Sequence, residues 1–135
     1  MDSVKRLIEL HDSKIEAIAE IEDQIIVFMQ VYIHKTEERN GQTTCTGWGQ
    51  VAAIAFTQAS IEGEIEEFPV DVSSGKFKLD GEVYSNLMPI VVNHTGAVEL
   101  DLTMTTSEMI MIRGAKAVLT LLGDEFYIDD CPDWD

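Results

Sequence analysis

Apolar and polar side chains alternate with a period of two along much of this chain. Near the N-terminus the apolar members of the pattern are Ile15, Ala17, Ala19 and Ile21. Later in the chain they are Val98, Leu100, Leu102 and Met104. Successive side chains of a β-strand point to opposite faces, so this period gives each strand one apolar and one polar face. The pattern therefore predicts an all-β protein of mainly antiparallel strands.

The length and composition of the chain suit one folded domain. It has 135 residues, of which 45% are hydrophobic and 25% are charged, and a chain of this size buries a core without disulfides or metals. Turn signals separate about nine or ten short strands, which favours a β-sandwich or a flattened barrel. We expect a single domain over residues 1–135, with an acidic C-terminal tail from about residue 129.

Local patterns predict several hairpins. Residues 14–21 and 24–34 are rich in β-branched and aromatic side chains and are separated by a very short connection, which predicts two paired strands. Asn40-Gly41 and Asp80-Gly81 are strong signals for tight hairpin turns, because both dipeptides tolerate positive backbone φ angles.

Other segments give less regular patterns. Residues 3–10 are expected to form a short helical turn or irregular lead-in, with a strand opening inside them as the alternative. Residues 36–49 are polar and predict a long loop, whereas residues 50–61 predict a strand whose many alanines make a helix the rival. Turns are also expected at residues 73–75 and 93–96.

The charge of the chain restricts its partners. Nine basic residues face 25 acidic ones, giving a net charge of −16, and no Lys or Arg occurs in residues 40–75 or 79–112. Such a chain repels phosphate backbones and anionic membranes, so nucleic acid and membrane are not expected as partners. It attracts a basic protein at low salt, although an acidic surface also serves solubility. Without a signal-peptide pattern or a bilayer-length apolar run, we expect a cytoplasmic protein.

His11, Asp12 and Ser13 supply the three residue types of a hydrolytic triad. A triad needs side chains that converge from separate elements, whereas in an extended run His11 and Ser13 project to one face and Asp12 to the other. We therefore interpret the segment as a structured turn whose Asp and Ser side chains bond nearby backbone groups before the first strand. A polar site at these residues is the alternative.

The three histidines give no metal-site signature. His11, His34 and His94 are far apart in the sequence, and the chain contains neither a His-x-x-x-His nor a Cys-x-x-Cys pattern. We expect no metal and no cofactor. A hydrolase that uses His11 or His94 beside a carboxylate remains an alternative function.

The candidate contact residues are aromatic and sulfur-containing. Trp48 lies between two glycines, which permit unusual backbone angles, and could anchor a ligand or fold back over the sheet edge. Trp134 could pin the tail to the domain or insert into a partner. Met109 and Met111 share a strand face with Arg113, and adaptable Met-rich surfaces bind partners when they are not filling a core.

Two segments carry a resemblance to other proteins. Leu10-His11-Asp12-Ser13, followed by Ile15 and Ile18, resembles an N-terminal pattern in small bacterial proteins of no established activity. Residues 112–127 resemble the closing part of such chains. The resemblance implies no catalytic or binding residue. Some immunity proteins of polymorphic toxins are similarly small, acidic and rich in β structure. This is an analogy in size, charge and fold class, and it assigns no residue a role.

These observations favour a non-catalytic protein-binding module, immunity-like in that it would neutralise a basic partner through its acidic surface. One alternative is a barrel that binds a small apolar ligand in an internal cavity, with Trp48 at its mouth. The second alternative is the hydrolase. Dimerisation that buries unpaired strand edges is left open by the sequence.

Overall fold

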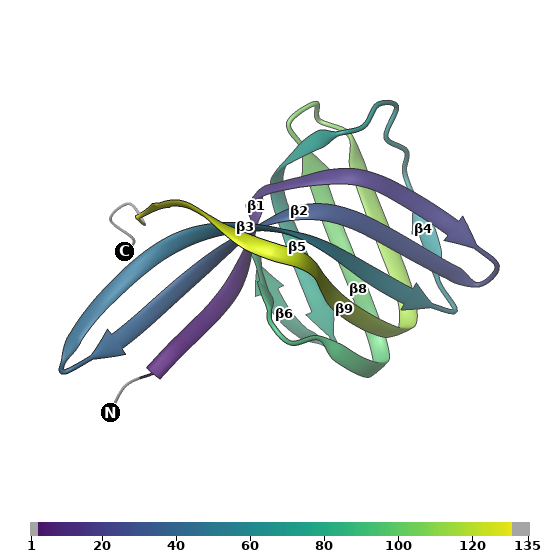
Figure 1. Ribbon diagram of the computed structural model, residues 1–135. Coiled ribbons are helices and arrows are strands. Elements are labelled where there is room, and N and C mark those ends of the chain that lie inside the picture. Colours follow the sequence, from purple (N-terminus) through teal and green to yellow (C-terminus); the bar gives the residue numbers. More distant parts are fainter. Residues whose placement is uncertain (1–2, 131–135) are drawn as a thin grey trace.

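The computed structural model describes residues 3–130, and these residues form only strands and connections (Figure 1). None of them forms a helix with the length and apolar character needed to cross a membrane. The strands in chain order are β1 (Ser3–Ile21), β2 (Gln24–Arg39), β3 (Gln42–Thr57), β4 (Ser60–Glu62), β5 (Val70–Leu79), β6 (Glu82–Ser85), β7 (Leu87–Pro89), β8 (Asn93–Met104) and β9 (Met109–Asp130). The prediction of an all-β fold is confirmed.

The strands form one sheet that closes on itself. Its order is β6-β5-β8-β9-β3-β2-β1-β7, with β4 added to β9. All pairings are antiparallel, and β5 also pairs with β1 through Lys14↔Asp71 and Ile15↔Val70. Because this short seam joins β5 and β1, which stand next to the two ends of the strand order, the sheet is a flattened barrel, one of the two architectures predicted.

The predicted hairpin turns lie where the sequence places them. Ile21 pairs with Gln24, so β1 and β2 join through two residues. Asn40 and Gly41 have φ angles of 51° and 77° between β2 and β3, and Asp80 and Gly81 have 48° and 88° between β5 and β6. Two consecutive positive φ angles match the twist of an antiparallel pair, which is why these dipeptides favour tight hairpins.

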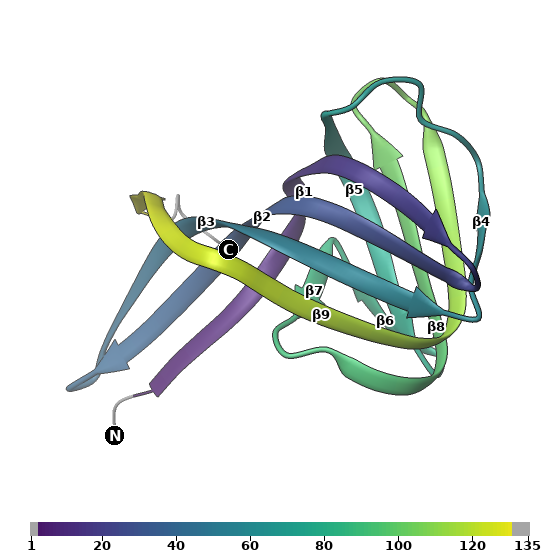
Figure 2. The same ribbon diagram turned by 45° about the vertical axis from the view of Figure 1, so that its right-hand side comes forward.

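Four strands continue beyond the barrel as a ribbon that we call the arm (Figures 1 and 2). It consists of residues 3–9 of β1, 32–39 of β2, 42–49 of β3 and 126–130 of β9, held by pairings such as Ser3↔Glu38 and Thr46↔Asp130. The helical turn expected at residues 3–10 is therefore wrong.

The long loop expected at residues 36–49 is also wrong, because most of that segment is paired strand. Water reaches both sides of the outer arm, where residues 38–44 are exposed. Polar side chains on both sides remove the alternation that identifies a half-buried strand.

Side chains of the inward faces fill the barrel. Phe56, Phe77 and Met29 are fully buried, and the alternating set of β8 is buried as predicted, at 3% exposure or less. The alternation predicted for β1 fails after Ile15, because a register shift between Ile15 and Ala17 changes which side chains face inward. Ile18 then packs against the core, and Ile21 is 55% exposed.

Two expected turns are parts of strands instead. Residues 73–75 belong to β5 and residues 93–96 to β8. A Cβ atom on Gly75 would lie 2.7 Å from Leu102 Cδ2, so this glycine allows a close approach between strands rather than a turn. The strand predicted at residues 50–61 is confirmed as far as Thr57.

Candidate functional site

The segment His11-Asp12-Ser13 forms a wide bulge in the middle of β1. Glu9 pairs with Tyr32 and Lys14 with Gln30, so residues 10–13 stand opposite Val31 alone. Leu10 is fully buried and its N–H donates to the carbonyl of Asn86 at 2.8 Å. His11 and Asp12 are thereby pushed outward and are exposed.

Ser13 fixes the shape of this bulge. Its Oγ donates to the carbonyl of Glu9 at 2.7 Å and accepts from the N–H of Tyr32 at 3.1 Å. Ser13 thus bonds backbone groups as predicted, but the expected turn before the first strand is wrong, because the segment is a bulge inside β1 and Asp12 contacts His11. His11 Nε2 lies 3.4 Å from Asp12 Oδ2, so these two side chains meet each other while Ser13 Oγ bonds the backbone.

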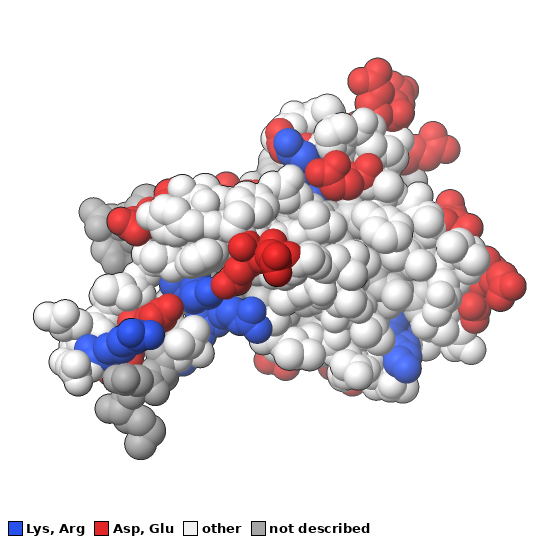
Figure 3. Space-filling view, in the orientation of Figure 1, with Lys and Arg blue, Asp and Glu red and all other residues white. Residues whose placement is uncertain are grey.

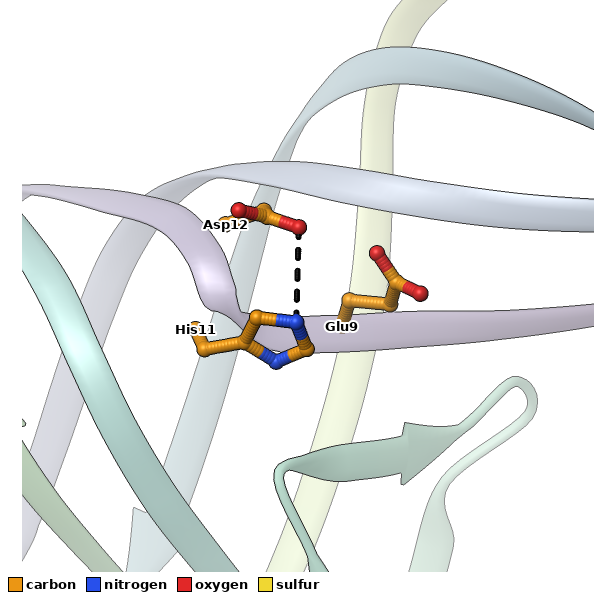
Figure 4. Close-up of side chains that lie close together, drawn as sticks. All are labelled: Glu9, His11 and Asp12. Carbon is orange, nitrogen blue, oxygen red and sulfur yellow. Dashed lines mark ion pairs between the residues drawn. The ribbon is translucent and has the colours of Figure 1, made fainter. Parts of the chain in front are cut away.

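Glu9, His11 and Asp12 are the described residues that could hold a metal ion (Figure 4). Their candidate ligand atoms all lie within 4.8 Å of one another. Ligands about 2.0–2.2 Å from a tetrahedral zinc are roughly 3.5 Å apart, so the cluster would have to contract to bind one. This group has no regular spacing in the sequence, because a bulge in β1 brings positions 9, 11 and 12 to one place.

A buried contact between a histidine and a carboxylate lies beside the bulge. His34 Nδ1 is 3.3 Å from Glu9 Oε1, and their side chains are 5% and 3% exposed. His34 Nε2 contacts the sulfur of Cys45 on β3. Burial lowers the pKa of the His34 imidazole, because the charged form loses hydration. These three groups tie β1, β2 and β3 together at the base of the arm.

Each histidine has a carboxylate neighbour, as a hydrolase would require, and His94 Nε2 lies 2.7 Å from Asp80 Oδ2. A hydrolase also needs a concave site around that pair. Five surface pockets of about 200 to 540 Å³ lie among the described residues, and none of these five is lined by a histidine or by Trp48.

Trp48 packs against the core at the base of the arm. Its Nε1 donates to Thr46 Oγ1 at 2.8 Å, and Lys35 Nζ lies 4.3 Å from the centre of its ring. The ring of Tyr127 meets it edge-on at 5.6 Å. All of these partners belong to the chain itself, so Trp48 supports the arm and presents Tyr127 at the surface.

The glycines beside Trp48 permit close contacts, not unusual backbone angles, since neither has a positive φ. A Cβ atom on Gly49 would lie 2.3 Å from the ring of Phe126. A Cβ atom on Gly47 would overlap the hydroxyl of Tyr32, which donates to Asp129 Oδ1 at 2.8 Å. Tyr32 and Phe126 therefore lie flat across the glycines. Trp134 lies outside the described residues.

Met109, Met111 and Arg113 share the outward face of β9, as predicted, opposite the buried Ile110 and Ile112. Met109 is 66% exposed and borders a pocket of about 290 Å³.

Arg113 Nε donates to Glu99 Oε1 at 2.7 Å. Hydrogen bonds from Lys78 and Arg113 hold the pKa of Glu99 at about 2, whereas burial and the neighbouring Glu99 raise the pKa of Asp101. Arg113 is thus already engaged by its own chain.

The largest group of exposed apolar side chains lies on the last part of β9 and was not identified from the sequence. Its members are Leu122, Phe126, Tyr127 and Ile128, which are 39%, 46%, 52% and 45% exposed. Carboxylates surround them: Asp124, Glu125, Asp129 and Asp130. We call these eight residues the β9 patch. The signal in the sequence is an aromatic and aliphatic run inside an acidic segment.

Charges are unevenly distributed over the face in Figure 3. Asp and Glu are scattered around the barrel, and the largest group of Lys and Arg on this face lies near the base of the arm. Lys35 is the cation that the structure places against the β9 patch, and its Nζ is 2.6 Å from Glu125 Oε1. The other three carboxylates of the patch have no ion pair with a described Lys or Arg.

Comparisons with known proteins give no relative: no family model matches the chain, and neither a curated protein nor a solved structure is significantly similar to it. The resemblance of residues 10–13 to small bacterial proteins stays a prediction.

Proposed function

We propose that the protein is a non-catalytic binding module that holds a basic protein partner against its arm. Binding would cover cationic groups of the partner and so neutralise it. The observation that carries the proposal is the β9 patch, in which exposed apolar side chains are interleaved with carboxylates. An apolar cluster of this kind on a surface is typical of an interaction site.

The patch combines the two contributions that a specific interface needs. Phe126, Tyr127 and Ile128 offer apolar area that a partner can remove from water. Asp124, Asp129 and Asp130 form no ion pair with a described Lys or Arg, although tyrosine hydroxyls donate to Asp129 and Asp130. The net charge of −16 attracts a basic molecule over a longer range. Charged and apolar contacts together select a partner that is both basic and apolar on its binding surface.

Calorimetric titration with a designed peptide tests this function. The probe is a peptide of about ten residues that alternates Lys and Val, a pattern that favours an extended strand, and its matched control alternates Glu and Val. We expect the Lys–Val peptide to bind and the Glu–Val peptide not to bind. Raising the salt from about 0.1 M to about 1 M, which shortens the screening length from ~10 to ~3 Å, should weaken binding at least about tenfold.

Variants locate the site. Phe126→Ser combined with Ile128→Ser should weaken binding of the Lys–Val peptide about tenfold or more, because the apolar area of the patch is lost. Val83→Ser is the matched control, since Val83 is 50% exposed but lies on β6, which among the described strands pairs with β5 and not with β9. Equal binding of both peptides, or equal loss in both variants, would contradict the proposed function.

A further inference from the structure

The last part of β9 has one free edge. From Thr120 to Asp130 it pairs with β3 on one side. The pairing of β9 with β8 ends at Val118, and the N–H of Leu119 donates to the carbonyl of Val92 at 2.9 Å. Beyond that point no strand among residues 3–130 pairs with the other side of β9, and Figures 1 and 2 both show it as an outer strand of the arm.

We propose that this free edge accepts an extended basic segment of the partner as an additional antiparallel strand. The inference rests on the proposed function and specifies how the partner binds there. A free edge presents a row of backbone N–H and C=O groups that a second chain can pair with, and strand addition is a common mode of peptide recognition. The free edge and the exposed side chains occupy the same residues of β9, so a single strand would cover both.

The side chains of the β9 patch select the incoming strand by charge. Residues directly opposite each other in an antiparallel pair lie about 5 Å apart, where opposite charges attract and like charges repel. By its register with β3, β9 has Phe126 and Asp129 on one face. Tyr127 and Asp130 lie on the other face. An added strand that alternates basic and apolar residues would therefore place Lys or Arg beside the carboxylate of one face and apolar side chains beside the aromatic ring of the other. The segment that fits is about eight residues long and alternates basic with apolar or aromatic residues.

The same charges disfavour a second copy of this chain as the occupant. Pairing β9 with β9 of another copy would place the acidic groups of the two patches against one another. The free edge of β1 carries Lys5 and Arg6, but only residues 3–6 precede the pairing of Leu7 with Pro89. That edge is much shorter than the free edge of β9, so a foreign basic strand is the better complement.

Backbone methylation of the peptide separates strand addition from binding by side chains alone. The Lys–Val peptide is compared with a version in which every residue is N-methylated, so that its charge and side chains stay but no N–H can pair with β9. We expect the unmethylated peptide to bind at least about thirtyfold more tightly. In an extended strand, the N–H groups of alternate residues point to the same edge. A peptide methylated only on its Val residues therefore keeps the N–H groups of its Lys edge and should retain most of the affinity.

The outcomes distinguish this inference from the proposed function. Equal affinity of the fully methylated and unmethylated peptides would overturn strand addition while leaving the binding module intact. Failure of every basic peptide to bind would overturn both. Light scattering on the protein alone at low salt should show a monomer. If it shows self-association, and the Phe126→Ser, Ile128→Ser variant abolishes that association, a second copy occupies the edge and the inference is wrong.

Discussion

Several single residues hold the strands at distances that other side chains would not allow. Gly63 is the clearest case, because its φ is +91° and a Cβ atom there would lie 2.0 Å from the carbonyl oxygen of Met109. Gly41 also has a positive φ, +77°, but a Cβ atom there would meet nothing within 4 Å. Comparing substitutions at the two glycines therefore separates the cost of a positive φ angle from the cost of steric overlap.

Gly63→Ala should therefore destabilise the protein much more than Gly41→Ala. The positive φ alone costs about 1 kcal/mol for alanine, and this is the whole cost expected at Gly41. At Gly63 the backbone of β9 must also move, so we expect a loss of about 3 kcal/mol or more in the free energy of unfolding. Urea denaturation of the two variants measures both values, and equal losses would show that β4 does not hold its close contact with β9.

Asp101 is a charged residue that opposes folding at neutral pH. Burial raises its pKa, and its Oδ1 is buried without a hydrogen-bond partner among the described residues. A carboxyl whose pKa is raised in the folded state destabilises that state once it is ionised. Asp101→Asn should thus increase the free energy of unfolding at pH 7 by up to about 1 kcal/mol, and this gain should fade as the pH falls toward about 4, below which the acid is protonated in both states.

Glu99 provides the control of opposite sign. Its pKa is held at about 2 by hydrogen bonds from Lys78 and Arg113, so its ionised form stabilises the folded state. Glu99→Gln should cost about 1–2 kcal/mol at pH 7, a range reduced for partial exposure, and the cost should disappear as the pH falls from about 4.5 to about 2. If both variants change stability in the same direction at pH 7, the assignment of these two carboxylates is wrong.

Among the strands and turns, those with one buried face or a specific turn dipeptide can be predicted from the sequence, whereas strands exposed to solvent on both faces cannot. The β5–β6 hairpin could be predicted because Asp80-Gly81 fixes its turn, and β8 because one of its faces is buried. The arm could not be predicted, because its outer residues are exposed to solvent on both faces and show no alternation of apolar and polar side chains. Register shifts are equally invisible, because an extra residue in one strand depends on the partner strand opposite it.

In the candidate site too, some features have a local signal in the sequence and others depend on neighbouring strands. The acidic and apolar composition of the β9 patch can be read from the sequence. That this strand would lack a neighbour on one edge depends on where β8 stops pairing, which no local pattern shows. The cluster at Glu9 and His11 likewise depends on the bulge of β1.

The bulge of β1 should depend on Ser13. Removing its Oγ by Ser13→Ala leaves the carbonyl of Glu9 and the N–H of Tyr32 without their partner inside the protein, because Ser13 is only 2% exposed. We expect a loss of about 1–3 kcal/mol and faster hydrogen exchange of the Tyr32 amide. Ser60→Ala, at an exposed position of β4, is the control. An unchanged Tyr32 exchange rate would mean that Ser13 does not hold the bulge.

At the scale of the whole molecule, one property acts on stability and on partner binding in opposite directions. The net charge of −16 makes the folded chain repel itself, and it also attracts a basic partner. Salt screens both effects. The protein should therefore gain stability under the conditions in which it loses its partner.

Thermal unfolding at increasing sodium chloride tests the first half of this statement. Between about 0.05 M and about 0.5 M salt we expect Tm to rise by a few degrees, because screening relieves repulsion among the carboxylates. The Lys–Val peptide titrated over the same range should bind progressively more weakly. A Tm that falls with salt would show that ion pairs such as Lys35–Glu125 contribute more than the overall repulsion.

Hydrogen exchange of the backbone amides, measured with and without the Lys–Val peptide, shows whether a basic strand adds to the free edge of β9. If a basic strand adds to the free edge, the peptide should slow exchange in residues 120–130 of β9, while amides in β5 and β6 of the barrel keep their rates. Slowing confined to other strands, or no slowing in β9 under conditions where the peptide is bound, would contradict the account.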